Sequence, residues 1–285
     1  MSGMLDLLAA ELNKVAPEKE DFVGEDGLLY CGFCKTPRQR WLEIPFRGRT
    51  ERRKVHILCD CRLSAQERDR EERMLFAEQS YQKALVKKCG IGEERLSRVA
   101  FPQFPQDAAL VFCREWVENW LGQDRKTGKG IYLTGGVGCG KTTLLLCMLR
   151  MLVEGYRNPV VLQEIAERRR EADGFKPVFY YTRTVDLINR IKAGFGNPEA
   201  EDILGLCKET PVLFLDDLGA EKPTDWVREQ LYDLIDERYN ARLPIHITTN
   251  LSIDRLAGVL GERIADRLRE MCFQLTIDRP SFRQG

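Results

Sequence analysis

Apolar and polar positions follow two different rhythms along the C-terminal part of the chain. Short runs rich in β-branched, aromatic and leucine residues are typical of buried strands, and the stretches between them have the apolar spacing of helices. The predicted strands lie at residues 130–134, 178–181, 211–215, 243–249 and 273–277. The predicted helices lie at about 107–121, 142–149, 184–193, 199–207 and 261–269. This alternation predicts an α/β fold of three layers, with helices on both faces of a parallel sheet.

The first 90 residues have a different pattern. Residues 1–30 are acidic, and leucines with helical spacing predict a short amphipathic helix there, which either docks a partner or packs on its own domain. Ser64 and Glu67 form a capping-box pattern that starts a highly charged helix running to about Lys88. We therefore predict an N-terminal domain at 1–62, a helical linker at 63–90 and a larger domain at 91–285, with a polar surface insertion at 157–176.

The composition gives no overall charge bias. The chain has 285 residues, with 44 Lys and Arg against 44 Asp and Glu, so nucleic-acid binding requires a local basic patch. No apolar run approaches the roughly 18 residues of a membrane-spanning helix. Residues 1–10 lack the basic region and cleavage site of a secretory signal. We expect a cytoplasmic protein without a membrane association.

Residues 135–142 are the first candidate for chemistry. They fit the pattern G-x-x-x-x-G-K-[ST] and lie between a predicted strand and a predicted helix, as a phosphate-binding P-loop (Walker A motif) does. The glycines let backbone N–H groups surround phosphate oxygens, and the helix adds the positive end of its dipole. Lys141 is placed to reach the β- and γ-phosphates, and the Thr142 hydroxyl to bind Mg²⁺. The alternative is a glycine-rich turn in which the lysine occurs by chance.

Two carboxylates at the end of the third apolar run form the second candidate, a Walker B motif. This pattern predicts that Asp216 holds Mg²⁺ through water and that Asp217 polarises the attacking water as a general base. At the end of the next strand, Asn250 is placed to position that water beside the γ-phosphate. The alternative for the aspartates, and for Asn250, is that they cap the helices that follow.

Four cysteines in the N-terminal domain have the spacing of metal ligands. Cys31 and Cys34 form a C-x-x-C knuckle, and Cys59 and Cys61 follow after 24 intervening residues. Four thiolates suit Zn²⁺ in a closed structural site, whose binding energy would fold a module with too little core of its own. His56 is a possible substitute for one cysteine of the second pair. The alternatives are four reduced core cysteines or a redox disulfide; the other cysteines are scattered, which predicts small apolar side chains or free thiols.

The segment around these cysteines is basic and contains aromatic residues. Its cations are Lys35, Arg38, Arg40, Arg47, Arg49, Arg52, Arg53, Lys54 and Arg62, against Glu43, Glu51 and Asp60. Phe33, Trp41 and Phe46 are interleaved with them. Cations with aromatic rings can bind single-stranded nucleic acid by charge and stacking. An acidic protein surface is an equal candidate, and a merely solvated β-hairpin is the third.

Two arginines four residues apart share one face of the last predicted helix. Arg263 and Arg267 are candidates for a finger that reaches a neighbouring subunit and neutralises transition-state charge. The alternative is a surface helix whose arginines form salt bridges.

The order of these motifs resembles the DnaC/IstB-type AAA+ ATPases over roughly residues 90–285. The similarity is carried by Walker A, L-F-L-D-D-L-G at 213–219, T-T-N-L at 248–251, G-E-R-I-A-D-R-L at 261–268 and S-F-R at 281–283. It implies a P-loop AAA+ fold without a separate helical lid, ATP and Mg²⁺ as cofactors, and a homo-oligomer. By motif matching, Asn250 takes the sensor 1 role, Arg267 is the first and Arg263 the second finger candidate, and Arg283 is similar to the sensor 2 arginine. The residues expected to contact the nucleotide are Gly135, Gly136, Val137, Gly138, Cys139, Gly140, Lys141, Thr142, Thr143, Asp216 and Arg283.

The resemblance implies a replicative-helicase loader that binds ATP, single-stranded DNA and a helicase. A zinc-ribbon-like module before the ATPase domain is similar to that of DnaI-like loaders, whose N-terminal domain grips the helicase. One alternative is a helper ATPase of transposition, which would bind duplex DNA and a transposase. The other is a zinc-dependent adaptor whose ATPase is vestigial.

Overall fold

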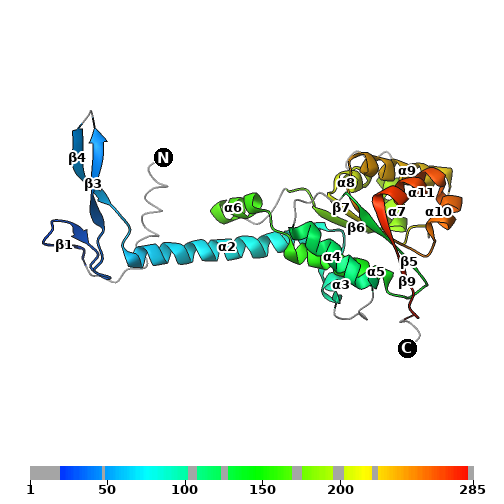
Figure 1. Ribbon diagram of the computed structural model, residues 1–285, viewed down its shortest axis with the longest axis horizontal. Helices are drawn as coiled ribbons and strands as arrows, with labels where there is room; N and C mark the ends of the chain where they lie inside the picture. Colours follow the sequence, from blue (N-terminus) through cyan, green and yellow to red (C-terminus); the bar gives the residue numbers. More distant parts are fainter. Residues whose placement is uncertain are drawn as a thin grey trace. The chain divides into compact units, whose positions relative to one another are not determined.

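The computed structural model describes residues 20–46, 49–101, 108–122, 128–168, 175–194, 202–219 and 224–281. The predicted amphipathic helix near the N-terminus therefore lies outside the described residues. Contacts divide the chain into two compact units, Met1–Phe76 and Ala77–Gly285, which we call unit 1 and unit 2 (Figure 1). In the described part of the chain, no helix has both the length and the apolar character needed to cross a lipid bilayer.

Unit 1 is built from two small antiparallel pairs of strands. β1 (Phe22–Val23) pairs with β2 (Leu29–Tyr30), and β3 (Gln39–Phe46) pairs with β4 (Arg49–His56) in a hairpin that matches Gln39 to His56. The hairpin lies in sequence between the short Cys31–Cys34 turn and the second cysteine pair, in which Cys59 immediately precedes α2 and Cys61 lies in its first turn. Since a two-stranded hairpin has little core of its own, another source of stability is needed here.

Helix α2 (Asp60–Lys88) begins four residues before the capping box that the sequence suggested. The carbonyl of Cys59 already accepts hydrogen bonds from the N–H groups of Arg62 and Leu63, at 3.0 and 2.9 Å, so the helix grows directly out of the second cysteine pair. Its C-terminal part buries Ala77, Tyr81 and Leu85, which are four residues apart and share one face. That face packs inside unit 2, where the Tyr81 ring contacts the Phe175 ring in a tilted arrangement at a centroid distance of 5.2 Å.

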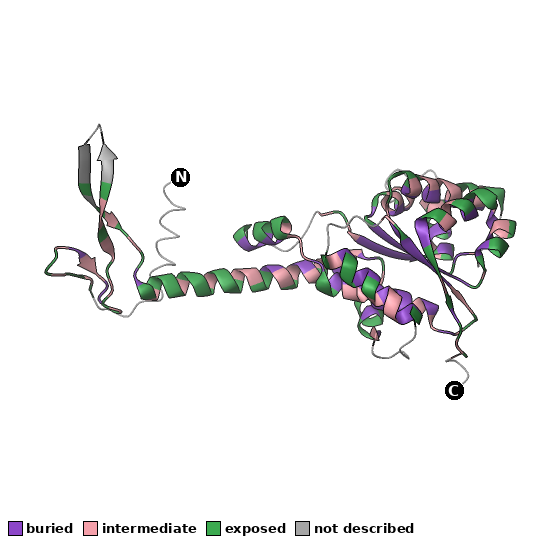
Figure 2. Ribbon diagram, in the orientation of Figure 1, coloured by how far each residue is buried: buried purple, intermediate pink, exposed green. Residues whose placement is uncertain are grey.

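The core of unit 2 is a five-stranded parallel sheet in the order β6-β7-β8-β5-β9. The strands are β5 (Gly130–Gly135), β6 (Phe179–Arg183), β7 (Val212–Asp216), β8 (Ile245–Thr249) and β9 (Cys272–Ile277). All five coincide with the apolar runs; β5 to β8 are buried over most of their length, whereas β9 is buried only at its two ends (Figure 2). The predicted α/β fold with a parallel sheet is confirmed.

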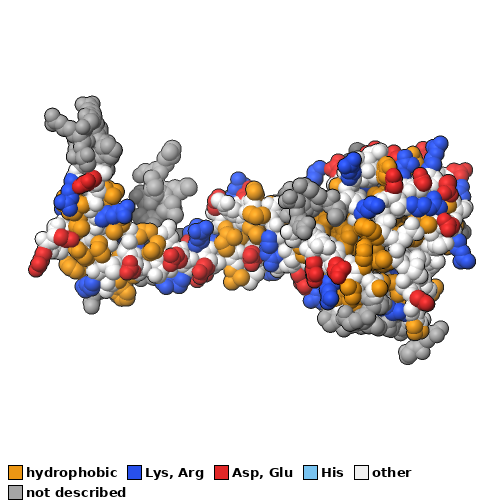
Figure 3. Space-filling view, viewed as in Figure 1, with side chains coloured by type: hydrophobic (Ala, Val, Ile, Leu, Met, Phe, Trp, Pro, Cys, Tyr) orange, Lys and Arg blue, Asp and Glu red, His pale blue; other side chains and the backbone are white. Residues whose placement is uncertain are grey.

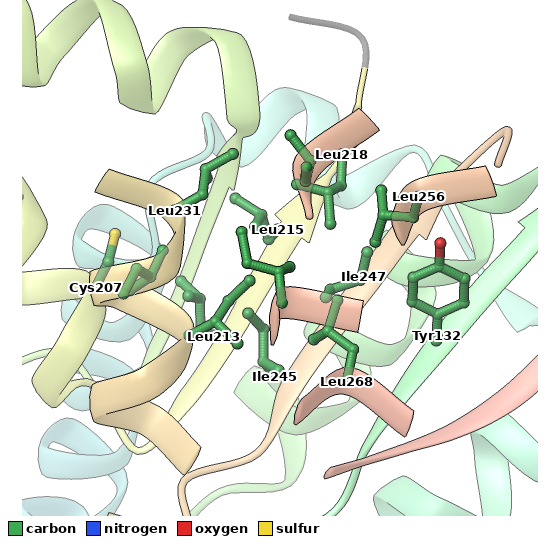
Figure 4. Close-up of a cluster of buried hydrophobic side chains, with 14 of the residues drawn as sticks. Tyr132, Cys207, Leu213, Leu215, Leu218, Leu231, Ile245, Ile247, Leu256 and Leu268 are labelled. Carbon is green, nitrogen blue, oxygen red and sulfur yellow. The ribbon is translucent and has the colours of Figure 1, made fainter. Parts of the chain in front are cut away.

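Helices lie on both faces of this sheet. The helices of unit 2 that follow α2 are α3 (Glu93–Ser97), α4 (Ala108–Gly122), α5 (Lys141–Gly155), α6 (Pro159–Arg168), α7 (Thr184–Gly194), α8 (Ile203–Glu209), α9 (Asp225–Asn240), α10 (Ile253–Leu260) and α11 (Glu262–Met271). α4 and α5 pack on one face, where Trp116 and Phe214 both contact His246. α7 to α11 pack on the other face, and Figure 4 shows Leu213, Leu215, Ile245 and Ile247 of the sheet facing Leu231, Leu256 and Leu268 of these helices.

Two segments differ from the pattern expected from sequence. The polar segment 157–176 contains α6, whose Leu162, Ile165 and Ala166 are buried, so part of it packs on the protein instead of forming a surface insertion. α9 was not predicted, although Thr224 caps its first turn and Val227, Leu231 and Leu234 have helical spacing. Its many acidic and basic residues hide this apolar stripe from a search based on average hydrophobicity.

Candidate functional site

The P-loop connects β5 to α5 at the carboxyl edge of the sheet. Gly138 and Gly140 have φ angles of 79° and 95°, in the left-handed region where glycine carries no penalty. A Cβ on Gly138 would lie 2.1 Å from the Ser281 hydroxyl, and one on Gly135 would lie 2.5 Å from the Ile277 carbonyl. The glycines of this loop are therefore required both by its backbone and by the chain that passes over it.

Lys141 is buried although it carries a charge. Its Nζ donates to the carbonyls of Gly135 and Gly136, at 2.9 and 2.7 Å, and to Oδ1 of Asn250 at 2.7 Å. Only 8% of the residue is exposed. These three oxygens hold the ammonium group at the centre of the loop, between Walker A and the end of β8.

Asp216, at the end of β7, accepts three hydroxyl hydrogen bonds. Thr142 donates to Oδ1 at 2.9 Å, Thr248 donates to the same oxygen, and Tyr181 donates to Oδ2 at 2.7 Å. Asp216 is 2% exposed. Burial, followed by the neighbouring Asp216 charge, raises the pKa of Tyr181, so its hydroxyl stays a proton donor. The contact with Thr142 joins Walker A to Walker B.

Asp217 has an unusual backbone for a residue with a side chain. Its φ is 60°, in the left-handed region, which costs conformational energy outside glycine. Its N–H donates to the Thr248 hydroxyl at 2.9 Å, and the next N–H, of Leu218, donates to the Thr248 carbonyl at 2.8 Å. Thr248 therefore fixes this conformation. Within the T-T-N-L motif the sequence singles out Asn250 and not Thr248, because nothing in the motif shows that the Thr248 hydroxyl meets the neighbouring strand β7.

Asn250 does not cap the following helix. The side chain of Ser252 caps α10 by accepting from the N–H of Arg255, whereas Asn250 is exposed and accepts from Lys141. The alternative that Asn250 is a helix cap is therefore wrong.

These groups surround one cavity of about 720 Å³. Gly138, Gly140, Lys141, Thr142, Thr143, Asp216, Asp217 and Asn250 line it, as does Val137, which is 69% exposed. Cys139 is fully buried beneath the loop, with its Sγ 3.9 Å from Nζ of Lys141. The cavity, its open glycine backbone and the Thr142–Asp216 contact fit a nucleoside triphosphate with Mg²⁺.

Three further arginines, which no sequence motif indicates, line the same cavity. Arg95 lies in α3, Arg98 is the residue that caps the C-terminus of α3, and Arg183 is at the end of β6, in register with Asp216. Arg183 forms a two-point ion pair with Asp186, at 2.6 and 2.8 Å. None of these arginines belongs to a motif with a fixed spacing to the P-loop, so only the folded sheet brings them there.

The candidate finger arginines have different surroundings. Arg267 forms an ion pair with Asp236, donates to the Tyr232 hydroxyl at 3.1 Å, and stacks over Tyr232 and Tyr239 of α9. Arg263 is exposed, and among the described residues it has no hydrogen-bond or ion-pair partner. Arg267 therefore ties α11 to α9, while Arg263 points to solvent. Arg283 lies outside the described residues.

The four predicted cysteine ligands of unit 1 lie together. Their Sγ atoms are all within 4.8 Å of one another. The Sγ atom of Cys61 lies 3.6 Å from that of Cys31 and 3.3 Å from that of Cys59. Sulfur atoms around a tetrahedral Zn²⁺ with bonds of about 2.3 Å lie roughly 3.8 Å apart, which these distances approach. The knuckle turns through Lys35, whose φ is 62° and whose N–H donates to the Cys31 carbonyl. Exposed His56 is not in this group.

The thiols of this cluster have widely different pKa values. A hydrogen bond with the Thr36 hydroxyl lowers the pKa of Cys34 to about 5. Burial, followed by the hydrogen bond with Cys59, raises the pKa of Cys61 to about 12. Adjacent thiols oppose one another's charge, and a dication between them removes that opposition. The six other cysteines are all buried free thiols within unit 2.

The basic hairpin of unit 1 has one mixed face. Lys54, directly opposite Trp41, and Arg52 lie over the Trp41 ring at 5.1 and 5.0 Å. Arg38 is paired with Asp21, and Lys35 lies over Phe22 at 4.8 Å. Basic and acidic side chains are interspersed on the visible face of this unit (Figure 3). The geometry of this face is compatible both with a nucleic acid and with an acidic protein surface as its partner.

Comparison with known proteins identifies relatives of unit 2. Residues 168–285 match the family described as IstB-like ATP binding protein. The replicative helicase loader DnaI of Bacillus subtilis strain 168 is 28% identical over 182 residues, 63% of this chain and 52% of DnaI. The phage-like element PBSX protein XkdC of the same strain is 31% identical over 176 residues, 60% of this chain and 58% of XkdC. The chain thus spans about half the length of these curated relatives.

A solved structure agrees with these sequence matches. The crystal structure of the DnaC helicase loader is 29% identical, with a TM-score of 0.51, and the match covers 65% of this chain and 99% of that one. The resemblance to the DnaC/IstB-type ATPases that the motifs suggested is confirmed, and with it the AAA+ fold of unit 2.

Proposed function

We propose that this protein is an ATP-dependent loader of a replicative DNA helicase, because unit 2 has the AAA+ fold and resembles the IstB-like ATP binding proteins and the DnaC helicase loader. The observation that carries the ATPase part is the convergence of Lys141, Thr142, Asp216, Asp217 and Asn250 on one cavity. The loader part rests on the relatives named as helicase loaders.

In this proposal each group of the cavity acts on a different part of Mg-ATP. The P-loop N–H groups and Lys141 bind the phosphates, and Thr142 and Asp216 would hold Mg²⁺. An ion held there would supply positive charge opposite the charge that develops on the transferred phosphoryl group. Asp217 accepts a proton from the attacking water, which Asn250 orients. Asp217, with its left-handed backbone, lines the cavity in which that water would lie.

We propose that the oligomer and its partners complete the activity. Arg263 is the better finger candidate for a neighbouring subunit, since its guanidinium is exposed while that of Arg267 is engaged by α9. A finger supplied by a neighbour makes hydrolysis by a monomer slow. The proposed partners are a replicative helicase and single-stranded DNA, and ATP hydrolysis releases the loader from them.

We further propose that Cys31, Cys34, Cys59 and Cys61 bind one structural Zn²⁺. Support comes from the mutual distances of their sulfur atoms and from the small core of unit 1. Four protein ligands leave no open position for catalysis, so this ion stabilises the fold.

The test of the ATPase is the Lys141→Ala variant. Loss of the ammonium group from the phosphate site should abolish ATP binding, measured by titration with a fluorescent ATP analogue. The Asp217→Asn variant should still bind ATP but should no longer hydrolyse it, in an assay that contains single-stranded DNA. Tight ATP binding by Lys141→Ala would contradict the P-loop assignment.

The loader function is tested separately by co-purification from the native host. Recovery of a replicative helicase supports it. Binding of duplex DNA and a transposase would support a transposition helper instead, and equal function of the parent and Asp217→Asn would support an adaptor with a vestigial ATPase.

A further inference from the structure

The Walker B carboxylate has a partner outside the nucleotide motifs. The hydroxyl of Tyr181, on the neighbouring strand β6, donates to Oδ2 of Asp216 at 2.7 Å. Tyr181 is 3% exposed and Asp216 is 2% exposed, so water does not compete for this bond. Adjacent Tyr180 points to the opposite face of the sheet, where its hydroxyl accepts from Arg190.

Because of this hydrogen bond, the two carboxylate oxygens of Asp216 have different partners. Oδ1 accepts from Thr142 and Thr248, on the side of the cavity, and Oδ2 is occupied by Tyr181. A carboxylate held at one oxygen cannot rotate to offer both oxygens to a cation. Groups that orient a metal ligand in this way commonly change metal affinity or activity by 10- to 100-fold when removed.

The backbone of Tyr181 has a second connection, at the edge of the sheet. β6 is the edge strand next to β7, and the N–H of Tyr181 donates to the carbonyl of Cys89 at 2.8 Å. Cys89 follows the last residue of α2, so the segment after this helix pairs with β6 at the residue that contacts Asp216. Arg95 of α3 lies over the Tyr181 ring at 5.7 Å and also lines the nucleotide cavity.

Gly90 permits this close approach. Its φ is 81°, and a Cβ there would lie 2.2 Å from the Tyr181 carbonyl oxygen and 3.0 Å from the Tyr180 ring. Any side chain at Gly90 therefore pushes the segment away from β6. By contrast, a Cβ on nearby Gly92 meets nothing within 4 Å.

We propose that Tyr181 is a positioning residue that sets the orientation of Asp216 according to how the segment after α2 packs on β6. The proposal rests on the proposed function, because it takes Asp216 as a ligand of nucleotide-bound Mg²⁺. The end of α2 is then coupled to the ATP site. A displacement of Cys89 and Gly90 shifts Tyr181, and the shift of Tyr181 changes the orientation of Asp216. A partner bound to the protein through α2 would then change the response to Mg²⁺ without touching the nucleotide.

The first experiment compares Tyr181→Phe with Tyr180→Phe in the full chain. The Mg²⁺ concentration that half-saturates binding of a non-hydrolysable ATP analogue should rise roughly 10-fold in Tyr181→Phe. Its affinity for the analogue in EDTA should equal that of the parent, because the P-loop is intact. Tyr180→Phe removes a hydroxyl from the other face and should leave the Mg²⁺ dependence unchanged.

The second experiment moves the segment without touching the site. Gly90→Ala should shift the Mg²⁺ dependence in the same direction as Tyr181→Phe, while Gly92→Ala should behave like the parent. In a Tyr181→Phe background, Gly90→Ala should add little further shift, since the connection is already broken.

The outcomes separate this proposal from the proposed function. If the parent binds no ATP, both fail. If the parent binds and hydrolyses ATP but Tyr181→Phe has the parent's Mg²⁺ dependence, or Tyr180→Phe shows the same shift, only the positioning role of Tyr181 is rejected. If Tyr181→Phe shifts and Gly90→Ala does not, the link to α2 is rejected.

Discussion

Thr248 connects both aspartates of the Walker B motif through a single hydroxyl group. That hydroxyl donates to Asp216 and accepts from the N–H of Asp217, so it is satisfied in both directions. It is 1% exposed. At the scale of one residue, the geometry of the proposed catalytic aspartates therefore depends on a side chain of β8 that takes no direct part in the proposed chemistry.

Thr248→Val should lower kcat for ATP hydrolysis by roughly 10- to 100-fold. Valine keeps the β-branched shape but leaves the Asp217 N–H without an acceptor, so the strained conformation loses its support. ATP affinity should change little, because Lys141 and the P-loop are unaffected. Steady-state kinetics measures the split, and Thr276→Val on the exposed part of β9 is the control. An unchanged kcat would show that Asp217 is held by other contacts.

His246 makes the stability of unit 2 sensitive to acid. It is fully buried between Trp116 and Phe214, and neither ring nitrogen has a hydrogen-bond partner in the described part of the chain. Burial, followed by the charge of Arg238, lowers its pKa from 6.5 to about 3. Below pH 6.5 the unfolded chain therefore binds a proton that the folded chain does not, and the free energy of unfolding falls as the pH falls from 6.5 toward 3.

From this linkage, protonation of His246 in the unfolded chain should lower the free energy of unfolding of the parent by about 2 kcal/mol between pH 7 and pH 5. A His246→Leu variant should not show this loss. Denaturant unfolding at the two pH values measures the difference. His56, the other histidine of the chain, is exposed, so His56→Leu should follow the parent. Equal pH dependence of the His246→Leu variant and the parent would contradict the assignment.

At the scale of elements, Arg238 joins the end of α8 to α9 and β8. It is fully buried and donates to the carbonyls of Cys207, Thr210 and Pro244 at 2.7, 2.8 and 2.6 Å. Burial lowers its pKa to about 9, which leaves it charged at neutral pH. A cation at the C-terminus of a helix also opposes the negative end of the helix dipole.

Arg238→Met should destabilise unit 2 by roughly 3 kcal/mol or more, because it leaves several buried carbonyls without donors. Thermal unfolding measures this loss. Arg255→Met, at an exposed position of α10, should change the melting temperature little. A stable Arg238→Met variant would mean that water replaces the guanidinium.

The elements that the sequence predicted well are those whose signal is local. β5 and β7 are uninterrupted apolar runs that lead directly into Lys141 and Asp216, so the motif and its strand are read together. α9 and α6 were missed because their apolar stripes are narrow among charged residues, and only the sheet they cover makes them amphipathic helices.

At the scale of the whole molecule, contacts between segments far apart in the chain could not be predicted from the sequence. Tyr181, Arg183 and Thr248 meet Walker B because β6 and β8 flank β7, and strand order cannot be read from a pattern of single residues. The same holds for Arg267, whose partners Asp236 and Tyr232 lie on α9. The clustering of the four cysteines, by contrast, was predicted from the sequence, because their residue type and spacing are themselves the signal.

Cys31→Ser should unfold unit 1 and leave unit 2 folded. The cysteine cluster would lose a ligand, and the two small strand pairs have little other core. The zinc content should fall, and the near-ultraviolet signal of Trp41 should disappear while ATP binding persists. Cys147→Ser, in the core of unit 2, is the comparison, and unchanged metal content in Cys31→Ser would contradict the zinc site.

The left-handed conformation of Asp217 brings the stability of the fold and the proposed catalysis into conflict at one torsion angle. A glycine would relax that angle at no steric cost, and with it would go the carboxylate that the proposed chemistry requires. Selection for stability alone would therefore favour glycine at this position, whereas selection for the proposed hydrolysis would favour aspartate.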